Sequence, residues 1–153
     1  MTEVALRDVI DDDLPILFEH QQDPEAARMA AFRSRDRERF MAHWAGILTD
    51  PNLTAKAVIA DGEVAGNILV FDGPTGEREV GYWIARELWG RGIASRALSL
   101  LLGEVETRPL FAGVAKHNVG SLRVLAKCGF TIVGEESGDD VERFVLRLDA
   151  DRA

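Results

Sequence analysis

WGRGIASRAL, residues 89–98, places two glycines directly before an apolar helical pattern. The first amide groups of a helix have no intrahelical acceptor, and the helix dipole adds about half a positive charge there. Gly90 and Gly92 leave these amides open to an anion because they carry no Cβ, and Arg91 and Arg96 add positive charge. The segment therefore predicts a diphosphate-binding turn, with a plain tight turn between strand and helix as the alternative.

Two common phosphate-binding motifs do not fit this segment. A Walker P-loop needs GxxxxGK followed by Ser or Thr, which the sequence lacks. A dinucleotide fingerprint needs GxGxxG, whereas the third glycine position holds Ser95, and no acidic residue stands about 20 residues later, near Ala115. The pattern therefore argues against a hydride-transfer enzyme.

Strand patterns precede the glycines. LTAKAVIA (53–60) and EVAGNILVF (63–71) are joined by Asp61-Gly62, a pair that readily adopts the positive φ angles of a two-residue hairpin turn. REVGYWIA (78–85) supplies the next strand. From Gly92 onward the apolar period is that of a helix, whose expected buried face is formed by Ala94, Ala97, Leu98, Leu101, Leu102 and Val105.

The remaining elements are predicted from the same kinds of signal. EVALRDV (3–9) indicates a strand, and Asp11–Asp13 precede a helix with Leu14, Leu17 and Phe18 on one face. Beyond a polar stretch near Asp23-Pro24, a second helix is expected from near Ser34 to Asp50-Pro51, with Phe40, Trp44, Ile47 and Leu48 on one stripe. The C-terminal part is expected to contain a strand at 109–115, a helix from Val119 to about Cys128 between Asn118 and Gly129, and strands at 130–136 and 141–149 joined by SGDD (137–140).

Together these elements predict one α+β domain over residues 1–153, with about seven strands in a largely antiparallel sheet and about four helices. The net charge of −8 argues against nucleic acid and anionic membranes as partners. A single cysteine excludes an internal disulfide, and the N-terminal sequence lacks the pattern of a signal peptide. No apolar run approaches the roughly 18 residues of a membrane span. We therefore expect a cytoplasmic protein, either a monomer or a homodimer.

Two motifs resemble one enzyme family. GYWIARELWGRGIASRAL (81–98) followed by NVGSLRVLAKCGF (118–130) resembles the GNAT superfamily of acyl-CoA N-acyltransferases, in particular its ribosomal-protein N-terminal acetyltransferase-like branch. The element order is similar over most of the chain, and the specific motifs lie between Glu79 and Phe130. The resemblance implies a three-layer fold around a mixed sheet, acetyl-CoA as cosubstrate and transfer of an acetyl group to an amine.

The resemblance also implies a coenzyme site. The family segment Gln/Arg-x-x-Gly-x-Gly/Ala, whose amides bind the pyrophosphate, corresponds to Trp89–Ala94, with Trp89 at the variable first position. The strand Tyr82–Ala85 is expected to part from its neighbour and pair with the pantetheine arm, so that the Ile84 N–H polarises the thioester carbonyl. Asn118 is expected either near the pantetheine or only as a helix cap. The expected cofactor-binding residues are Trp83, Ile84, Trp89, Gly90, Arg91, Gly92, Ile93, Ala94, Ser95 and Asn118.

The catalytic residues implied by the resemblance are Glu79 and Ser121. The tyrosine that often serves as the family's general acid is replaced by Leu125. Ser121 resembles a proton donor of the ribosomal-protein branch, with simple hydrogen bonding to the helix start as the alternative. Glu79 resembles a general base that often acts through water, with a solvated residue at a strand start as the alternative. Tyr82, the only tyrosine, is more readily interpreted as a packing or pocket residue than as an acid.

Cysteine and histidine suggest no separate chemistry. His20, His43 and His117 have no metal-ligand spacing with one another or with Cys128, so no metal site is predicted, and His117 is interpreted as an exposed loop residue. Cys128 lies seven residues beyond Ser121, on nearly the same side of a helix, which would suit an acyl-cysteine intermediate. We favour buried packing for it, because the resemblance implies direct transfer within a ternary complex.

The acceptor site is the least defined part. Arg28, Met29, Phe32 and Tyr82 are expected to form its walls, and the acidic surface favours a cationic amine such as a polyamine, an aminoglycoside or a basic protein N-terminus. Two other hypotheses remain open. Leu125 in place of tyrosine suits an acyl-CoA-binding regulatory protein with little or no turnover, whereas an interaction module without a cofactor leaves the glycine segment and Asn118 unexplained.

Overall fold

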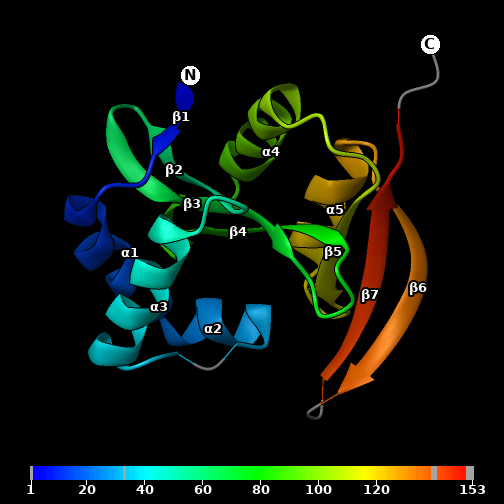
Figure 1. Ribbon diagram of the computed structural model, residues 1–153, viewed down its shortest axis with the longest axis horizontal. Coiled ribbons are helices and arrows are strands. Elements are labelled where there is room, and N and C mark those ends of the chain that lie inside the picture. Colours follow the sequence, from blue (N-terminus) through cyan, green and yellow to red (C-terminus); the bar gives the residue numbers. More distant parts are fainter. Residues whose placement is uncertain (1, 33, 139–140, 151–153) are drawn as a thin grey trace.

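The computed structural model describes residues 2–32, 34–138 and 141–150. The described residues form one seven-stranded sheet and five α-helices (Figure 1). The strands are β1 Val4–Asp8, β2 Thr54–Ala60, β3 Glu63–Asp72, β4 Arg78–Ile84, β5 Leu110–Ala115, β6 Thr131–Gly138 and β7 Val141–Leu148. The helices are α1 Leu14–Gln21, α2 Pro24–Ala30, α3 Arg37–Thr49, α4 Ile93–Glu104 and α5 Val119–Lys127.

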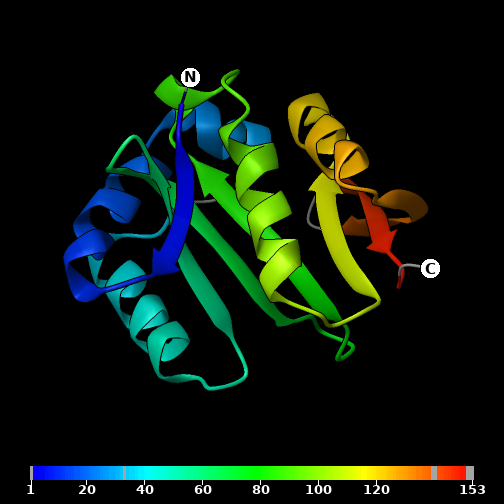
Figure 2. The ribbon, with the colours of Figure 1, turned by 90° about the horizontal axis from the view of Figure 1, so that it is seen from above.

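The sheet has the strand order β1-β2-β3-β4-β5-β7-β6 and is antiparallel except where β4 and β5 run parallel. Helices cover both faces (Figures 1 and 2). α4 and α5 pack on one face through a large apolar cluster, while α1 and α3 pack on the other through a smaller one. The expected three-layer α+β fold is confirmed, with one helix more than the sequence predicts.

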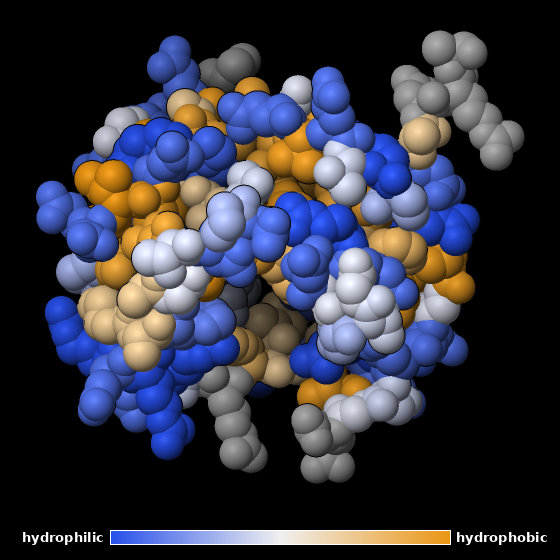
Figure 3. All heavy atoms as spheres, in the orientation of Figure 1, coloured by the Kyte–Doolittle hydropathy of each residue, from blue (hydrophilic) through white to orange (hydrophobic). Residues whose placement is uncertain are grey.

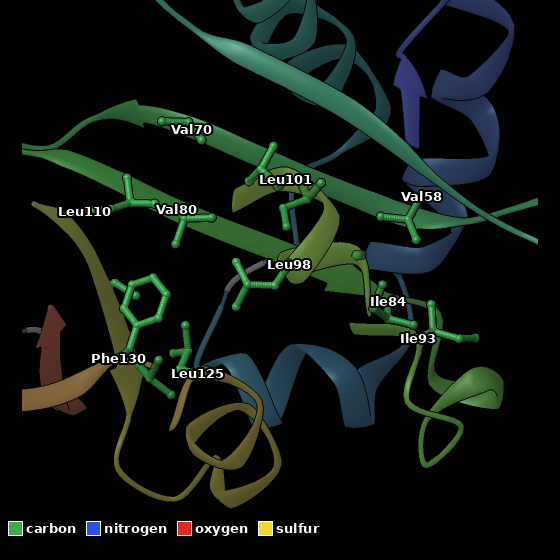
Figure 4. Packing of buried hydrophobic residues seen from close by; sticks show 14 of the residues in the cluster. Val58, Val70, Val80, Ile84, Ile93, Leu98, Leu101, Leu110, Leu125 and Phe130 are labelled. Carbon is green, nitrogen blue, oxygen red and sulfur yellow. The ribbon is translucent and has the colours of Figure 1, made fainter. Parts of the chain in front are cut away.

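The core on the α4 face follows from the helical period of that segment. Ile93, Ala97, Leu98 and Leu101 are buried, and the last two lie over Val70 and Val80 of the sheet (Figure 4). On the opposite face, α3 buries Phe40, Trp44 and Ile47. Leu48, expected on the same stripe, is 36% exposed because it lies roughly 80° around the helix from Phe40.

The sequence predicted turns correctly where the turn residues themselves determine the backbone angles. Asp61 and Gly62 have φ angles of 49° and 85°, as a tight hairpin turn requires. The second predicted hairpin is also present as β6 and β7, but Asp139 and Asp140 of its expected turn lie outside the described residues.

Helix boundaries in the N-terminal part differ from the prediction. α3 begins at Arg37 rather than near Ser34, because the Asp36 side chain caps it by accepting a hydrogen bond from the Arg39 amide at 2.8 Å. The polar stretch near Asp23 contains the additional helix α2. The Asp23 carboxylate accepts from the amides of Glu25 and Ala26, both at 3.0 Å, and Pro24 occupies the first helical position.

The parallel strands β4 and β5 stay together over only a short length. Their Cα register contains the single pair Glu79 and Phe111. Beyond it, β4 continues to Ile84 and β5 to Ala115 without further pairing between these described residues. The two strand ends therefore part toward the glycine segment and the start of α5.

Within the described residues, no helix has both the length and the apolar character needed to cross a bilayer. Hydrophilic residues cover most of the face seen in Figure 3, with hydrophobic residues in separate small groups between them.

The close approach of β3 and β4 requires glycine at position 66. A Cβ on Gly66 would lie 2.0 Å from the carbonyl oxygen of Trp83. Gly66→Ala is therefore expected to lower the free energy of unfolding by about 3 kcal/mol, as other overpacking substitutions do. Gly46→Ala is the matched control, because the added methyl group meets no atom within 4 Å and should stabilise α3 by roughly 0.5–1 kcal/mol. Urea unfolding of both variants would show this; equal stability of the two would contradict the packing argument.

Candidate active site

The glycine segment forms a turn whose backbone only glycine adopts easily. Gly90 and Gly92 have φ angles of 81° and 75°, and Gly92 is the N-terminal cap of α4. A Cβ at Gly90 would meet no atom within 4 Å, so open space adjoins the turn. The amides of the first helical turn have no intrahelical acceptor and lie beside this space.

That space is a cavity of about 420 Å³, within the usual size range of small-molecule sites. It lies between the end of β4 and the start of α5, beyond the point where β4 and β5 part. Its walls come from the end of β4, the glycine turn, the start of α5 and one side of α2. Of the expected cofactor-binding residues, Trp83, Ile84, Trp89, Gly90, Gly92, Ile93, Ala94, Ser95 and Asn118 line it.

Arg91 is the exception among those residues. It lies on a separate smaller cavity of about 260 Å³, together with His20 and Glu87. The two glycines on either side of Arg91 line the main cavity, so the turn presents its backbone there while the Arg91 side chain lies elsewhere.

The end of β4 offers a backbone donor to the cavity. The Ala85 amide donates to the Ala65 carbonyl of β3 at 2.9 Å. Because successive strand residues direct their amides to opposite edges, the Ile84 N–H is directed away from β3, toward the opening. The Ile84 carbonyl on this same edge accepts a hydrogen bond from the Trp89 indole at 2.9 Å. Trp89 thus fixes the turn against the strand end.

Three polar side chains meet at the start of α5. The Asn118 Oδ1 accepts a hydrogen bond from the Ser121 amide at 3.2 Å, so Asn118 caps the helix and also lines the cavity. The Ser121 hydroxyl lies 2.6 Å from the Tyr82 hydroxyl, which reaches it from β4. Burial raises the pKa of Tyr82 to about 12, despite the opposing effect of this hydrogen bond.

Leu125 and Cys128 lie further along the same helix. Leu125 is buried in the apolar cluster, so the position where many family members carry a tyrosine belongs to the core here. The Cys128 Sγ lies 3.7 Å from the Ser95 carbonyl, and burial raises the pKa of the thiol. Cys128 is not among the residues that line the cavity.

Glu79 does not line the cavity either. It stands at the point where β4 and β5 begin to part, and its carboxylate lies close to Gly73, where an added Cβ would come within 1.8 Å of Oε2. Burial raises the pKa of Glu79 first, and the charges of Glu136 and Glu77 raise it further. A carboxyl group with this environment is a stronger base than an exposed glutamate.

Helix α2 spans the opening and is held at both ends. Asp23 pairs with Arg86, which follows β4, at 2.7 Å. The Arg28 carbonyl accepts a hydrogen bond from His117, which follows β5, at 2.9 Å. The sequence prediction missed this helix, although Asp23 followed by Pro24 is a standard helix start. Its residues on the cavity wall are Ala26, Met29 and Ala30.

The residues expected at the acceptor site occupy different places. Met29 and Tyr82 line the cavity. The Phe32 ring packs edge-on against Trp83, with centroids 5.3 Å apart, so it supports the wall from behind. The Arg28 side chain pairs with Glu25 at the surface, and only its backbone reaches the β5–α5 connection. Gly120 and Val124 of α5, which carry no chemical signal in the sequence, also line the cavity.

In the described part of the chain, no three His, Cys, Asp or Glu side chains lie together in a way that would hold a metal ion. Burial lowers the pKa values of both His20 and His43, which keeps these rings neutral near pH 7.

The comparisons with known proteins identify the class of this site. The model of the acetyltransferase (GNAT) domain family matches residues 3–131, and the chain belongs to this family. It is an acetyltransferase with acetyl-CoA as cosubstrate, as the resemblance implied. None of the curated protein sequences matches the chain significantly.

Solved acetyltransferase structures share the whole fold. The aminoglycoside acetyltransferase AAC(6')-Ib in complex with coenzyme A has 17% identity and a TM-score of 0.77, covering 96% of this chain and 95% of that one. Spermidine N-acetyltransferase from Vibrio cholerae, in complex with CoA and spermine, has 16% identity and a TM-score of 0.80, covering 95% of each chain. RimJ from Mycobacterium smegmatis, in complex with CoA-disulfide, has 21% identity and a TM-score of 0.79, covering 96% of this chain and 82% of that one. At these identities the similarity is one of fold.

The glycine turn provides a direct test of the coenzyme site. Gly92→Val forces a branched side chain into a backbone with φ of 75° and into the space beside the amides. We expect acetyl-CoA affinity, measured by calorimetry, to fall by at least about tenfold. Gly103→Ala, further along α4 with no atom within 4 Å of the added methyl group, should leave affinity unchanged. A folded Gly92→Val variant with wild-type affinity would place the coenzyme elsewhere.

Proposed function

We propose that the protein transfers an acetyl group from acetyl-CoA directly to a cationic amine while both substrates are bound, and that residues 1–153 act as a single cytoplasmic N-acetyltransferase domain. The observation that carries this proposal is the cavity between the end of β4 and the start of α5, which combines the amides of the glycine turn with the edge of β4 that β5 leaves unpaired. Direct transfer is supported by Cys128, because its thiol is held protonated by burial and does not line the cavity.

Backbone groups carry the coenzyme in this proposal. The amides after Gly90 and Gly92 hold the pyrophosphate, and the pantetheine arm pairs with the edge of β4. The Ile84 N–H then donates to the thioester carbonyl and stabilises the negative charge that develops on its oxygen. The Ile84 N–H is already held in place by the hydrogen bonds of the neighbouring Ala85 amide and Ile84 carbonyl, so little reorganisation accompanies the reaction.

Side chains handle the protons. Ser121 faces the departing sulfur as hydrogen-bond donor, and its position is fixed by the Asn118 cap. Glu79 acts as base through water, because its carboxylate does not reach the cavity itself and its raised pKa suits proton uptake. The amine must lose its proton before it attacks the thioester carbon.

The acceptor side suits a cation with an apolar portion. Glu136 and Glu77 act on Glu79 as like charges, and a bound ammonium group would relieve that repulsion. Met29 and the Trp83 ring, supported by Phe32, offer apolar contact on the cavity wall. Polyamines and basic N-termini combine these properties, aminoglycosides supply the positive charge, and the acidic net charge would attract each of them.

The alternative is an acyl-CoA-binding regulatory protein with little or no turnover. It is favoured by Leu125, whose buried side chain removes the family's common general acid. Both functions require acetyl-CoA binding, but only the enzyme releases CoA when an amine is added.

The deciding experiment measures free thiol after acetyl-CoA is mixed with a panel of polyamines, aminoglycosides and basic peptides. We expect acceptor-dependent CoA release and an unchanged protein mass after incubation with acetyl-CoA alone. If no acceptor in the panel causes CoA release, the alternative of a regulatory protein is favoured. A protein that gained an acetyl group on Cys128 would contradict direct transfer.

Replacing Glu79 tests its role as base. Glu79→Gln removes the proton acceptor, so we expect kcat near neutral pH to fall by about 10²-fold. Glu79 accepts a proton only when ionised, and its raised pKa places this ionisation above the usual 4.5. The loss should shrink at high pH, where the amine deprotonates unaided. Glu104→Gln, at the exposed end of α4, is the matched control. An equal loss at every pH would assign Glu79 a purely structural role.

A further inference from the structure

Tyr82 and Ser121 form a hydrogen bond through their hydroxyl groups, in which either oxygen can be the donor. Their hydroxyl oxygens lie 2.6 Å apart, while the Tyr82 hydroxyl lies 3.4 Å from the Ser121 carbonyl. That carbonyl belongs to α5, where each carbonyl accepts from the amide four residues later. We infer that the phenol is the donor to the Ser121 hydroxyl oxygen, because this contact is shorter than the one to the carbonyl and a phenol is a stronger donor than the serine hydroxyl. The hydrogen of Ser121 itself is then free for another acceptor.

Both side chains line the same cavity, from opposite sides of the opening. Tyr82 comes from β4, and Ser121 comes from the first turn of α5, fixed by Asn118. Without the phenol, the Ser121 hydroxyl would turn back to the carbonyl of His117 or Asn118, as serine commonly does in a helix. Tyr82 thus decides whether the Ser121 hydrogen is available to the cavity.

We propose that Tyr82 is a positioning residue: it donates to Ser121 and thereby directs the Ser121 hydrogen to the sulfur of coenzyme A as the thioester carbon–sulfur bond breaks. The inference rests on the proposed function of the cavity. The amine nitrogen forms a bond to the acyl carbon as that carbon's bond to sulfur breaks, and the electron pair of the broken bond goes to sulfur, which accepts the Ser121 hydrogen bond. Tyr82 and Ser121 keep their protons, because the sulfur gains a proton from water and the proton that the amine loses to water balances it.

This arrangement replaces the missing tyrosine of α5. The hydroxyl pair reaches the cavity from β4 and the start of α5, whereas Leu125 belongs to the core. Because its pKa is raised to about 12, Tyr82 remains a donor throughout the neutral range. The hydrogen bond from Tyr82 to Ser121 is therefore independent of pH throughout the neutral range.

The thiol of bound CoA reports the arrangement without any acceptor. A hydrogen bond from Ser121 stabilises the thiolate, so the thiol pKa of CoA in the complex should lie below that of free CoA. It is measured from thiolate absorbance in the ultraviolet, with the complex of desulfo-CoA as the blank, which cancels Cys128 and Tyr82. We expect Tyr82→Phe to lower the thiolate-to-thiol ratio by about tenfold.

The partner variants distinguish positioning from structural support. Ser121→Ala should lower the ratio at least as much, and the double variant no further, because both changes remove the same hydrogen bond. Ser121→Thr retains the hydroxyl and should therefore keep the thiol pKa of bound CoA as low as it is in the wild-type protein. Affinity for desulfo-CoA should be the same in Tyr82→Phe and wild type. Ser99→Ala, exposed on α4, is the control hydroxyl deletion.

The outcomes separate the two proposals. If CoA binds and Tyr82→Phe leaves its thiol pKa unchanged, the positioning role is overturned while the proposed function stands. Additive effects of Tyr82→Phe and Ser121→Ala on the thiolate-to-thiol ratio would also overturn the positioning role. If neither CoA nor desulfo-CoA binds to the wild-type protein, the proposed function fails, and the positioning role fails with it.

Discussion

The structure depends on the separation of two parallel strands. β4 and β5 pair at Glu79 and Phe111 and then diverge, which leaves backbone donors and acceptors on both edges without a strand partner. Such groups need a partner, because unpaired buried amides are costly. The Trp89 indole satisfies the Ile84 carbonyl on one edge, and a ligand that presents an extended chain can satisfy the rest. The cavity is the space that this separation creates.

The separation is held open by the layers on either face. The larger apolar cluster packs α4 against Val80 and Ile84 of β4, and Gly66 permits β3 to approach the Trp83 carbonyl closely. On the other side of the opening, β5 is bound along its length by β7. α2 crosses the gap through Asp23 and the Arg28 carbonyl. The amides at the strand end are consequently oriented before any substrate arrives, which is the condition for electrostatic catalysis.

Local signals in the sequence predicted the elements well, and failed where three-dimensional context decides. The hairpin at Asp61-Gly62 and the glycine turn were predictable, because each depends on backbone angles that few residues adopt. α2 was missed because its seven residues carry too short an apolar pattern, although Asp23-Pro24 marked its start. The contact between Tyr82 and Ser121, 39 positions apart, could not be predicted, since nothing in either local pattern records the distance between β4 and α5. The burial of Glu79 beside Gly73 escapes the sequence for the same reason.

The proposed use of main-chain donors to bind the coenzyme has a consequence for how such proteins diverge. The backbone amides at the glycine turn and at Ile84 are present whatever side chains these residues carry. At most of these positions the backbone conformation is therefore constrained, but the type of side chain is not. Chains with 16–21% identity retain the same arrangement of strands and helices. In the proposed function, the wall formed by α2 is then free to change with the acceptor, while the coenzyme side tolerates substitutions everywhere except at the glycines.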